Sequence, residues 1–572
     1  MLIQRCTQLN TTLPLALGLA CFSVVTGLSA AEIDAGAVLN RYRQELTPGL
    51  PAPAPLSGET RLEAFNGFEF VDLPAAAQDV AKAFLLPQRG HQVVQQQLIS
   101  QLERHLQDAG LPFVFALMPA THPTDLPKLK AYQVAFGKVT VANQSAFDTE
   151  LARRVLSHNM QSGQPVDRIQ LERNSAILLE VDGLSSRFQM VPGEHPGVTD
   201  LLASLAAGRP IVGSVTVDNS GGDSLGRNTV RGDVAINNTL GMGDIFRLYG
   251  LHTQHSTMAG LDASYLAASA GWRLGLSLSR FSYGYDVGAL APVLNNHSTG
   301  SATYLGLSAV YPWIRNEYGR HTVSLNHDRA HTLGNATLRT DELTAAERNL
   351  SNILNTKWSA SIYGIQALPK EFSVSYQAAL SAGHARQDNA SAALQDQTSA
   401  RQMGTYGKLF LTASLSKQLQ LGEQVWLGTL NASAQRANAN LPGAEKMYFG
   451  GTSQMRAWAA QAVPVDEATY AEWKFERLLD AQWRVGVFVE AARYNQNHSN
   501  YLTAVGSTSV ATDLSNIGSM ADWGLSASYQ PSRNTLIKAS VARKLTSEPS
   551  VNTQTLLDPS RTRGWLSLSY FF

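Results

Sequence analysis

The residue with the clearest chemical potential is a single arginine late in the chain. Arg456 lies in the stretch MYFGGTSQMRAW, residues 447–458, where it follows the pair Gly450-Gly451 and has apolar neighbours. A guanidinium is always ionised, and a carboxylate matches its planar fork of donors with two parallel hydrogen bonds. A charge in a narrow, partly dry interior is costly without such a partner. What Arg456 can do therefore depends on where the fold places it.

Two histidine pairs and one tripeptide are the other candidate sites. The histidine pairs have ligand-like spacing: His252/His255 and His327/His331. Neighbouring strand positions face opposite sides, however, and no cysteine or tight carboxylate cluster accompanies the pairs. Arg231-Gly232-Asp233 resembles an integrin-binding tripeptide but lies inside an early strand, so we interpret it as a chance match. Because the sequence also has no nucleophile elbow, phosphate-binding loop or zinc-protease motif, we predict no enzymatic activity, no metal site and no cofactor.

The first residues resemble an export signal. Arg5 precedes an apolar run from Leu13 to Val25, and the small residues 29–31 offer a cleavage site before Glu32. We therefore predict a signal peptide, 1–31. Both cysteines of the chain lie within it: Cys6 and Cys21. The exported protein is then expected to have no disulfide and no cysteine-bound metal.

Composition narrows the class of protein. The chain has 572 residues, more than one ordinary domain, and its 45 Lys+Arg balance its 45 Asp+Glu. A chain without net charge is a poor partner for nucleic acid. Beyond the leader, no run of about 18 apolar residues remains that could form a transmembrane helix. The 45 glycines, 18 tyrosines and nine tryptophans suit a membrane β-barrel, in which lipid-facing and lumen-facing side chains alternate.

The segment that follows the leader changes character twice. Apolar residues at helical spacing predict a short amphipathic helix over 34–46, within the N-terminal segment 32–46, and four prolines in 47–60 predict an extended linker. Helical and strand periods then alternate, which predicts two small β-α-α-β-β units, 61–136 and 137–208. Their expected elements are helices over 91–108, 149–160 and 166–180, and strands over 113–119, 138–142, 186–193 and 201–208.

Residues 209–572 show period-two alternation instead. The leucines of 274–278 alternate with small polar residues, and the pattern recurs at 305–313 and 523–529. A closed barrel satisfies every backbone group in lipid, whereas an open sheet cannot. At roughly 22 residues per strand and turn, this length accommodates about sixteen strands. We therefore predict a multi-domain protein in which two small α/β domains precede a membrane-spanning antiparallel β-barrel.

Motifs at the entrance of the alternating region resemble a known family. The pieces are VPGEHPGVTDL (191–201), VDNSG (217–221), GR (226–227) and NNTLGMGD (237–244). Together they resemble the POTRA-to-barrel junction of two-partner-secretion outer-membrane transporters (TpsB, the haemolysin-activator and filamentous-haemagglutinin-transporter family). The resemblance implies a barrel in the bacterial outer membrane with POTRA domains in the periplasm, a plug-like N-terminal helix, and secretion of an unfolded partner protein through the barrel.

The same resemblance suggests the partners. They are a secreted TpsA-like exoprotein, the barrel assembly machinery during biogenesis, and outer-membrane lipid, with no nucleic acid. Tyr570 and Phe572 end the terminal strand WLSLSYFF on one face, a pattern that resembles the signal by which outer-membrane barrels reach their assembly machinery.

The resemblance also gives Arg456 a partner. Residues 441–460 resemble the family's long inward-folded loop, whose tip reads Val-Arg-Gly-Tyr or Phe; Arg456 falls on the tip arginine. Glu490, in FVEAA, falls on the acidic residue that this arginine meets on the barrel wall. Met455 and Ala457 depart from the family pattern, and because alanine lacks the freedom of glycine at positive φ, we expect a differently shaped tip. The remaining predicted loop residues are Gly450, Gly451 and Trp458.

Two other functions fit parts of this pattern. A factor that inserts other barrels into the membrane would resemble this chain in its barrel and arginine loop, but the junction motifs and the two POTRA-like units favour the exporter. A passive porin or receptor is the third alternative, and it needs no chain-binding domain before its barrel.

Overall fold

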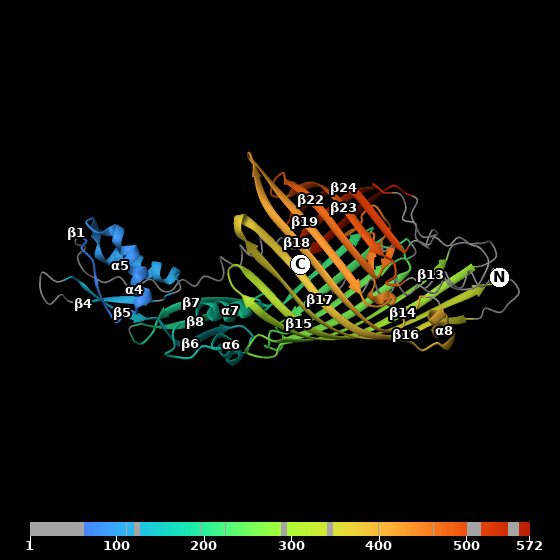
Figure 1. Ribbon diagram of the computed structural model, residues 1–572. Helices are drawn as coiled ribbons and strands as arrows, with labels where there is room; N and C mark the ends of the chain where they lie inside the picture. Colours follow the sequence, from blue (N-terminus) through green and yellow to red (C-terminus); the bar gives the residue numbers. More distant parts are fainter. Residues whose placement is uncertain are drawn as a thin grey trace.

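The computed structural model describes most of the chain beyond the predicted leader. The described residues are 62–109, 111, 113–118, 126–195, 197–223, 225–287, 295–339, 347–398, 400–460, 463–499, 516–546 and 560–572. The predicted signal peptide 1–31, the segment 32–46 and the linker 47–60 lie outside them. Figure 1 shows two small α/β domains at one end of the molecule and a barrel of long tilted strands beside them.

The first α/β domain is a three-stranded sheet packed against two helices. Its elements are β1 (Leu62–Ala64), β2 (Glu69–Val71), α4 (Ala75–Leu85), η2 (Leu86–Gln88), β3 (Gln92–Val94), α5 (Gln95–Asp108), β4 (Phe113–Met118) and β5 (Lys128–Gln133). The sheet order is β2-β5-β4, so β2 and β4 form its edges. The helix predicted over 91–108 begins later than expected, because residues 92–94 pair with β1. Helix α4 was not located in advance, although Ala77, Ala81 and Leu85 bury one of its faces at helical spacing.

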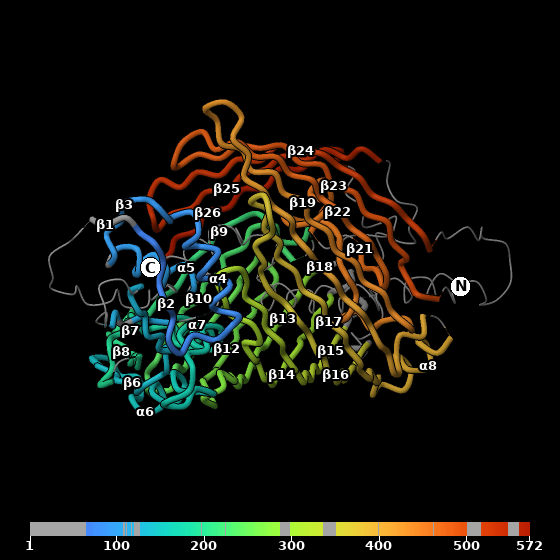
Figure 2. Tube along the Cα trace, turned by 60° about the vertical axis from the view of Figure 1, so that its left-hand side comes forward, coloured from blue at the N-terminus to red at the C-terminus, as the bar shows by residue number. Residues whose placement is uncertain are grey.

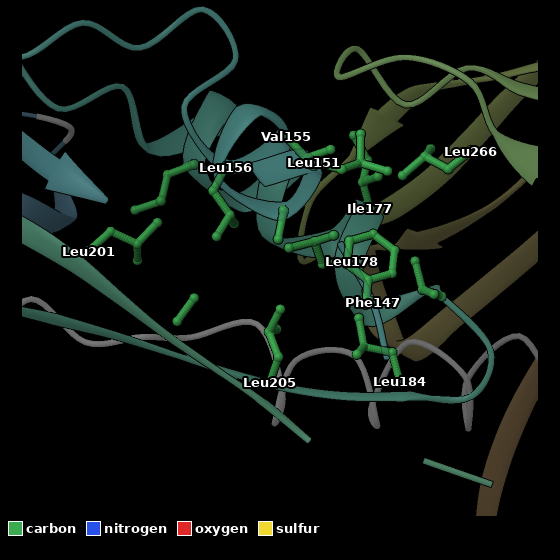
Figure 3. Packing of buried hydrophobic residues seen from close by; sticks show 14 of the residues in the cluster. Phe147, Leu151, Val155, Leu156, Ile177, Leu178, Leu184, Leu201, Leu205 and Leu266 are labelled. Carbon is green, nitrogen blue, oxygen red and sulfur yellow. The ribbon is translucent and has the colours of Figure 1, made fainter. Parts of the chain in front are cut away.

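The second α/β domain repeats the same plan, as predicted. It contains β6 (Ala135–Gln144), α6 (Thr149–Leu156), α7 (Arg168–Leu179), β7 (Leu184–Pro192) and β8 (Val198–Ala207), with sheet order β6-β8-β7. Both helices begin at an aspartate cap, because Asp148 accepts a hydrogen bond from Leu151 N and Asp167 accepts one from Gln170 N. Leucines of both helices and both later strands fill the core (Figure 3).

This second domain is packed onto the rim of the barrel. Leu266, at the end of barrel strand β12 (Ser256–Leu266), belongs to the same apolar cluster as Ile177 of α7 (Figure 3). Glu180 accepts hydrogen bonds from Arg315 Nε at 2.7 Å and Arg320 Nε at 3.1 Å, and both arginines come from the barrel. The α/β domain and the barrel therefore share a core and an ionic contact.

The turn within NNTLGMGD forms part of this contact. Gly241 O accepts a hydrogen bond from Asp148 N at 2.8 Å, and Gly241 has a positive φ of 75°. A Cβ at this position would lie 2.5 Å from Ala146 O. Glycine is therefore required by both the backbone conformation and the close approach of the two chains.

Sixteen strands close the barrel, as the alternation predicts. They are β9 (Ile211–Asp218), β10 (Thr229–Asn237), β11 (Ile245–Thr253), β12, β13 (Arg273–Val287), β14 (Asn295–Arg315), β15 (Gly319–Arg339), β16 (Glu347–Leu368), β17 (Phe372–Gln387), β18 (Gly404–Leu421), β19 (Gln424–Ala437), β22 (Glu467–Leu478), β23 (Trp483–Asn495), β24 (Ile517–Ser532), β25 (Thr535–Lys544) and β26 (Thr562–Phe571). Every neighbouring pair is antiparallel, and β26 pairs with β9 to close the ring, whose wall Figure 2 shows. A short 3-10 turn, η3 (Pro369–Glu371), joins β16 to β17, and a helix, α8 (Ala390–Thr398), lies between β17 and β18 within a region where we expected only strands.

Topology fixes the two ends of the barrel. The second α/β domain leads directly into β9, and the chain ends with β26 at the same rim, where Phe572 N donates to Gly213 O at 3.0 Å. The family resemblance implies that this rim faces the periplasm, so β19, β23 and β25 end, and β22, β24 and β26 begin, at the opposite, extracellular rim. Along these strands the outward positions are mostly exposed and apolar, as lipid requires.

Candidate functional site: a loop latched to the inner wall

The connection from β19 to β22 folds back against the inside of the barrel. It contains a 3-10 turn, η4 (Gly443–Glu445), and two short strands, β20 (Met447–Phe449) and β21 (Val463–Val465), which pair with each other. Apolar residues of this inward loop, including Phe449, Met455 and Trp458, pack against inward residues of β22 to β25. Trp458 is 1% exposed, and Phe449 is completely buried. The loop is therefore an ordered hairpin with its own core.

Three carboxylates form a row on the wall behind the loop tip. Glu472 on β22 pairs in register with Glu490 on β23, and Glu490 pairs with Asp522 on β24. All three face inward and are at most 3% exposed. Three neighbouring carboxylates repel one another unless donors and a cation compensate them. The loop tip supplies both.

The guanidinium of Arg456 lies against this row. Arg456 Nη1 donates to Glu472 Oε1 at 2.6 Å and lies 3.5 Å from Glu490 Oε1. Its Nε donates to Thr452 O at 3.0 Å, and its central carbon lies 4.2 Å from the centre of the Phe488 ring. The structure thus brings Arg456 and Glu490 together, but the closest carboxylate to the guanidinium is Glu472.

Glu490 holds mainly the backbone of the tip. Its Oε1 accepts from Met455 N at 3.1 Å and from the Tyr470 hydroxyl at 2.5 Å, and its Oε2 accepts from Arg456 N at 2.9 Å. Hydrogen bonds to a charged acceptor are the stronger kind, and these two backbone donors fix the orientation of the tip. The two glutamates therefore have different roles: Glu472 binds the side chain of Arg456, and Glu490 binds the backbone of the loop tip.

Two further contacts complete the set of bonds that holds the loop tip on the wall, which we call the latch. Ala457 N donates to Asp522 Oδ2 at 3.0 Å, and Trp565 Nε1, from the last strand, donates to Arg456 O at 2.8 Å. These contacts connect the tip to β24 and β26. Backbone bonds at 455, 456 and 457 are thus all directed to the wall.

The tip takes its bend from residues other than the alanine. Gly450 and Gly451 have φ of 100° and 115°, and Met455 has a φ of 54°, a conformation that is unusual for a non-glycine residue. Ala457 is not among the residues with positive φ in the described part of the chain. The substitution of alanine at 457 therefore needs no strained backbone.

A second anchor holds the base of the loop on a different part of the wall. Glu445, in η4, accepts hydrogen bonds from Lys357 Nζ at 3.2 Å and Asn355 Nδ2 at 3.0 Å, and its Oε2 lies 2.8 Å from Lys408 Nζ. Burial alone would raise the pKa of Glu445, but the two lysines outweigh burial and lower the pKa to about 2. Its carbonyl oxygen also accepts from Lys408 Nζ and from Gln435 Nε2.

An ion pair within the connection closes the base of the hairpin. Lys446 Nζ donates to Asp466 Oδ1 at 2.5 Å, next to the β20–β21 pairing. Asp466 Oδ2 also accepts from His498 N at 2.9 Å. The two ends of the loop are therefore joined to each other as well as to the wall.

Sequence reasoning missed Glu472, Asp522 and Glu445. Glu472 and Asp522 could have been found from strand parity, because they occupy the same inward register as Glu490. Glu445 carries no such signal, since it lies in a turn. Its partners come from β16 and β18, which are remote in sequence.

The other predicted residues lie elsewhere. Arg231 is on β10, as expected for the tripeptide, and pairs with Asp218. His252 contacts Thr257, and His331 contacts Asn352. The terminal aromatics lie at the periplasmic rim and are exposed: Tyr570 and Phe572.

Within the described ranges, no group of three or more His, Cys, Asp or Glu side chains could hold a metal ion. None of the helices found there is both long enough and apolar enough to cross a bilayer.

Comparison with known proteins agrees with this architecture. Residues 197–472 match the profile of the family described as haemolysin secretion/activation protein ShlB/FhaC/HecB. The heme/hemopexin transporter protein HuxB of Haemophilus influenzae is 23% identical over 413 residues, which cover 72% of this chain and 70% of HuxB. The outer membrane transporter CdiB of Dickeya dadantii is 25% identical over 345 residues, 59% of this chain and 58% of that protein.

Solved structures share the fold. CdiB from Escherichia coli matches with a TM-score of 0.62 at 14% identity, covering 94% of this chain and 98% of that chain. CdiB from Acinetobacter baumannii matches with a TM-score of 0.58 at 14% identity, covering 94% and 99%. Similarity at this level of identity concerns the fold alone.

The fold and the latched loop define an outer-membrane β-barrel transporter with two periplasmic POTRA domains. The chain is similar to the two-partner-secretion outer-membrane transporter family, as its junction motifs predict. This similarity agrees with the predicted location in the bacterial outer membrane.

Proposed function

We propose that the protein captures one unfolded exoprotein in the periplasm and releases it to the outside through its barrel when the inward loop leaves the wall. The observation that carries the proposal is the loop itself. It fills part of the lumen and is held by ionic anchors that can dissociate without unfolding the barrel. The proposal includes no catalytic step and no cofactor, and folding of the exoprotein outside the cell makes its passage directional.

The edge of the first POTRA sheet supports the capture step. Strand β4 is an edge strand, and Phe115 N donates to Glu103 Oε1 at 2.8 Å rather than to the neighbouring strand β5. Antiparallel pairing alternates, so the N–H of Leu117 faces the same free edge. Leu117 is 42% exposed. An extended chain could add to this edge through backbone hydrogen bonds, which tolerate many sequences.

A matched pair of variants tests the edge. Leu117→Pro removes an outward N–H while the bonds to β5 remain, and proline is tolerated on edge strands. Leu117→Ala keeps the N–H and removes the same side chain. We expect the proline variant, but not the alanine variant, to reduce secretion while both barrels fold normally. Equal secretion by both variants would exclude strand addition at this edge.

Quantitative proteomics of the medium and of the outer membrane, with and without the protein in its native host, tests the function as a whole. Loss of one or two large proteins from the medium, with other barrels unchanged, is the expected result. Depletion of many outer-membrane barrels would instead make the protein an assembly factor. The predicted contacts with the barrel assembly machinery, at Tyr570 and Phe572, and with outer-membrane lipid belong to this proposal as well.

A further inference from the structure

The outer surface of the barrel has a hollow on the same strands that carry the latch. A cavity of about 410 Å³ lies over β22 and β23. Among the residues that line it, Tyr470 and Tyr494 face inward and are each 3% exposed beneath the loop. The open side of the cavity is therefore formed by the outward residues, and it faces the membrane.

Small side chains form the floor of this recess. Ala471, Ala491 and Ala521 pair directly across β22, β23 and β24 on the outward face. Two positions closer to the periplasm, the paired outward residues are large: Trp473, Val489 and Trp523. The large residues make a ledge below the small ones. A bulky group could therefore approach the wall above the ledge.

Charged residues form the upper edge. Arg493, opposite Thr469, is exposed and makes no ion pair with any described residue. Arg436 Nη1 lies 3.4 Å from Glu467 Oε2, and its side chain is 64% exposed. Glu467 is shared with Asn495 and with a histidine, so Arg436 retains free N–H donors.

The height of these arginines matches the outer lipid headgroups. The outward residues of β23 below Arg493 are apolar from Trp483 to Ala491. The ten steps from Trp483 to Arg493, at about 3.3 Å per residue and a tilt of about 40°, rise about 25 Å, the usual height of the lipid-facing band. Leu409, directly opposite Arg436 on β18, is 40% exposed, which places this arginine at the edge of the apolar band.

We propose that this recess binds the phosphate-bearing headgroup of a lipid in the outer leaflet. Arg493 and Arg436 would donate to the phosphate, which guanidinium groups bind with matched geometry. The alanine floor would leave room for the sugar or glycerol part, and the ledge of Trp473 and Trp523 would contact the first methylenes of the acyl chains.

The position of this site gives it a link to the latch. Outward Ala471, Ala491 and Ala521 alternate along their strands with inward Glu472, Glu490 and Asp522. A lipid in the recess would thus lie directly behind the carboxylates that hold the loop tip, one sheet thickness away. Occupancy of the recess would stiffen the wall on which the latch is built.

Native mass spectrometry of the full protein in detergent, titrated with purified lipid A, tests the site. The double variant Arg436→Gln/Arg493→Gln should weaken lipid retention by about tenfold per arginine, the value of one charge-assisted hydrogen bond. Ala491→Leu keeps both arginines and the apolar face but fills the floor, and it should also lower retention. Arg280→Gln removes another exposed outward arginine, on β13, and should change nothing.

The outcomes separate the sources of binding. Wild-type retention of lipid A with loss on removal of its phosphates supports recognition of the headgroup. Equal retention of lipid A, its dephosphorylated form and a zwitterionic phospholipid would overturn the proposal, as would equal losses in the double variant and in Arg280→Gln. Resistance of each variant to unfolding in detergent shows that a loss of binding is not a loss of the barrel.

Discussion

Replacing the wall glutamates Glu472 and Glu490 one at a time with glutamine should show that they hold the loop tip in different ways. Glu472→Gln removes the carboxylate 2.6 Å from the guanidinium of Arg456, whose side chain is 12% exposed. Glu490→Gln removes the negative charge and turns one of the two acceptor oxygens into an NH2 group, so one backbone N–H loses its acceptor and the other keeps only a neutral one. Breaking a buried ion pair by removing one partner costs about 3–5 kcal/mol, and tenfold in an equilibrium corresponds to about 1.4 kcal/mol. Each single change should therefore increase the open fraction of the channel by roughly 100-fold or more.

The difference appears when Arg456 is also changed. In an Arg456→Gln background, Glu472→Gln should lose most of its effect, because the pair is already broken. Glu490→Gln should keep most of its effect, because the backbone donors remain in that background. The coupling energy of Arg456 with Glu472 should be about 2 kcal/mol or more, and that with Glu490 clearly smaller.

The two coupling energies come from two double-mutant cycles, Arg456 with Glu472 and Arg456 with Glu490. Single-channel recording in planar bilayers measures the open-to-closed ratio of the wild type, of each single variant and of each double variant. Cysteine labelling provides an independent readout, because both native cysteines, Cys6 and Cys21, lie in the predicted leader. A single cysteine at Ala468, an inward wall residue that is 1% exposed beneath the loop, becomes accessible when the loop leaves the wall. Equal coupling of Arg456 to both glutamates would refute the division between side-chain and backbone anchors.

Three further outcomes are expected. Glu445→Gln should raise the open fraction by an order of magnitude or more, because Lys408 loses its carboxylate and Lys357 keeps only its longer contact with Asp328 at 3.5 Å. Glu423→Gln at an exposed turn should not raise the open fraction, and bilayer recording distinguishes the two variants. Burial raises the pKa of Glu103, so the folded domain favours the protonated carboxyl group. The domain therefore loses folding stability as the pH rises above the ordinary glutamate range, where the buried carboxyl group must ionise. Glu103→Gln, which stays neutral, should slow hydrogen exchange in the first domain at neutral pH but not near pH 4. Gly241→Ala should weaken the contact between the second domain and the barrel by about 2 kcal/mol more than Gly422→Ala. Both glycines have a positive φ, but only a Cβ at 241 would meet a backbone oxygen. Proteolysis of the junction measures the difference.

The sequence was sufficient for the architecture because its periods are long and consistent. Alternation over residues 209–572 predicted the closed barrel, and its length predicted about sixteen strands. The α/β domains followed from alternating helical and strand periods, such as the helix predicted over 149–160, which contains α6. Helix α4 was missed although Ala77, Ala81 and Leu85 form its buried face at helical spacing.

The site was less accessible to sequence reasoning. Arg456 and Glu490 came from family resemblance, which names positions but does not measure distances. The closer carboxylate, Glu472, lies on a neighbouring strand: strand parity places it on the inward face, and the register of β22 with β23 places it beside Glu490. Which of the two carboxylates lies closer to the guanidinium is then a separate choice, because both belong to glutamates. That choice depends on the position of the tip, which no local pattern encodes.

The two anchors of the loop belong to one mechanical unit. Glu445 is held by β16 and β18, whereas Arg456 is held by β22. Between them lie the β20–β21 pairing and the Lys446–Asp466 ion pair, both internal to the connection. If that hairpin stays folded when the loop moves, neither anchor can be released alone. The free energies of the two anchors then add in the closed state, so a thermal opening is rare. A chain that enters from the periplasm and disturbs one anchor would lower the barrier for both, which couples opening to the presence of cargo.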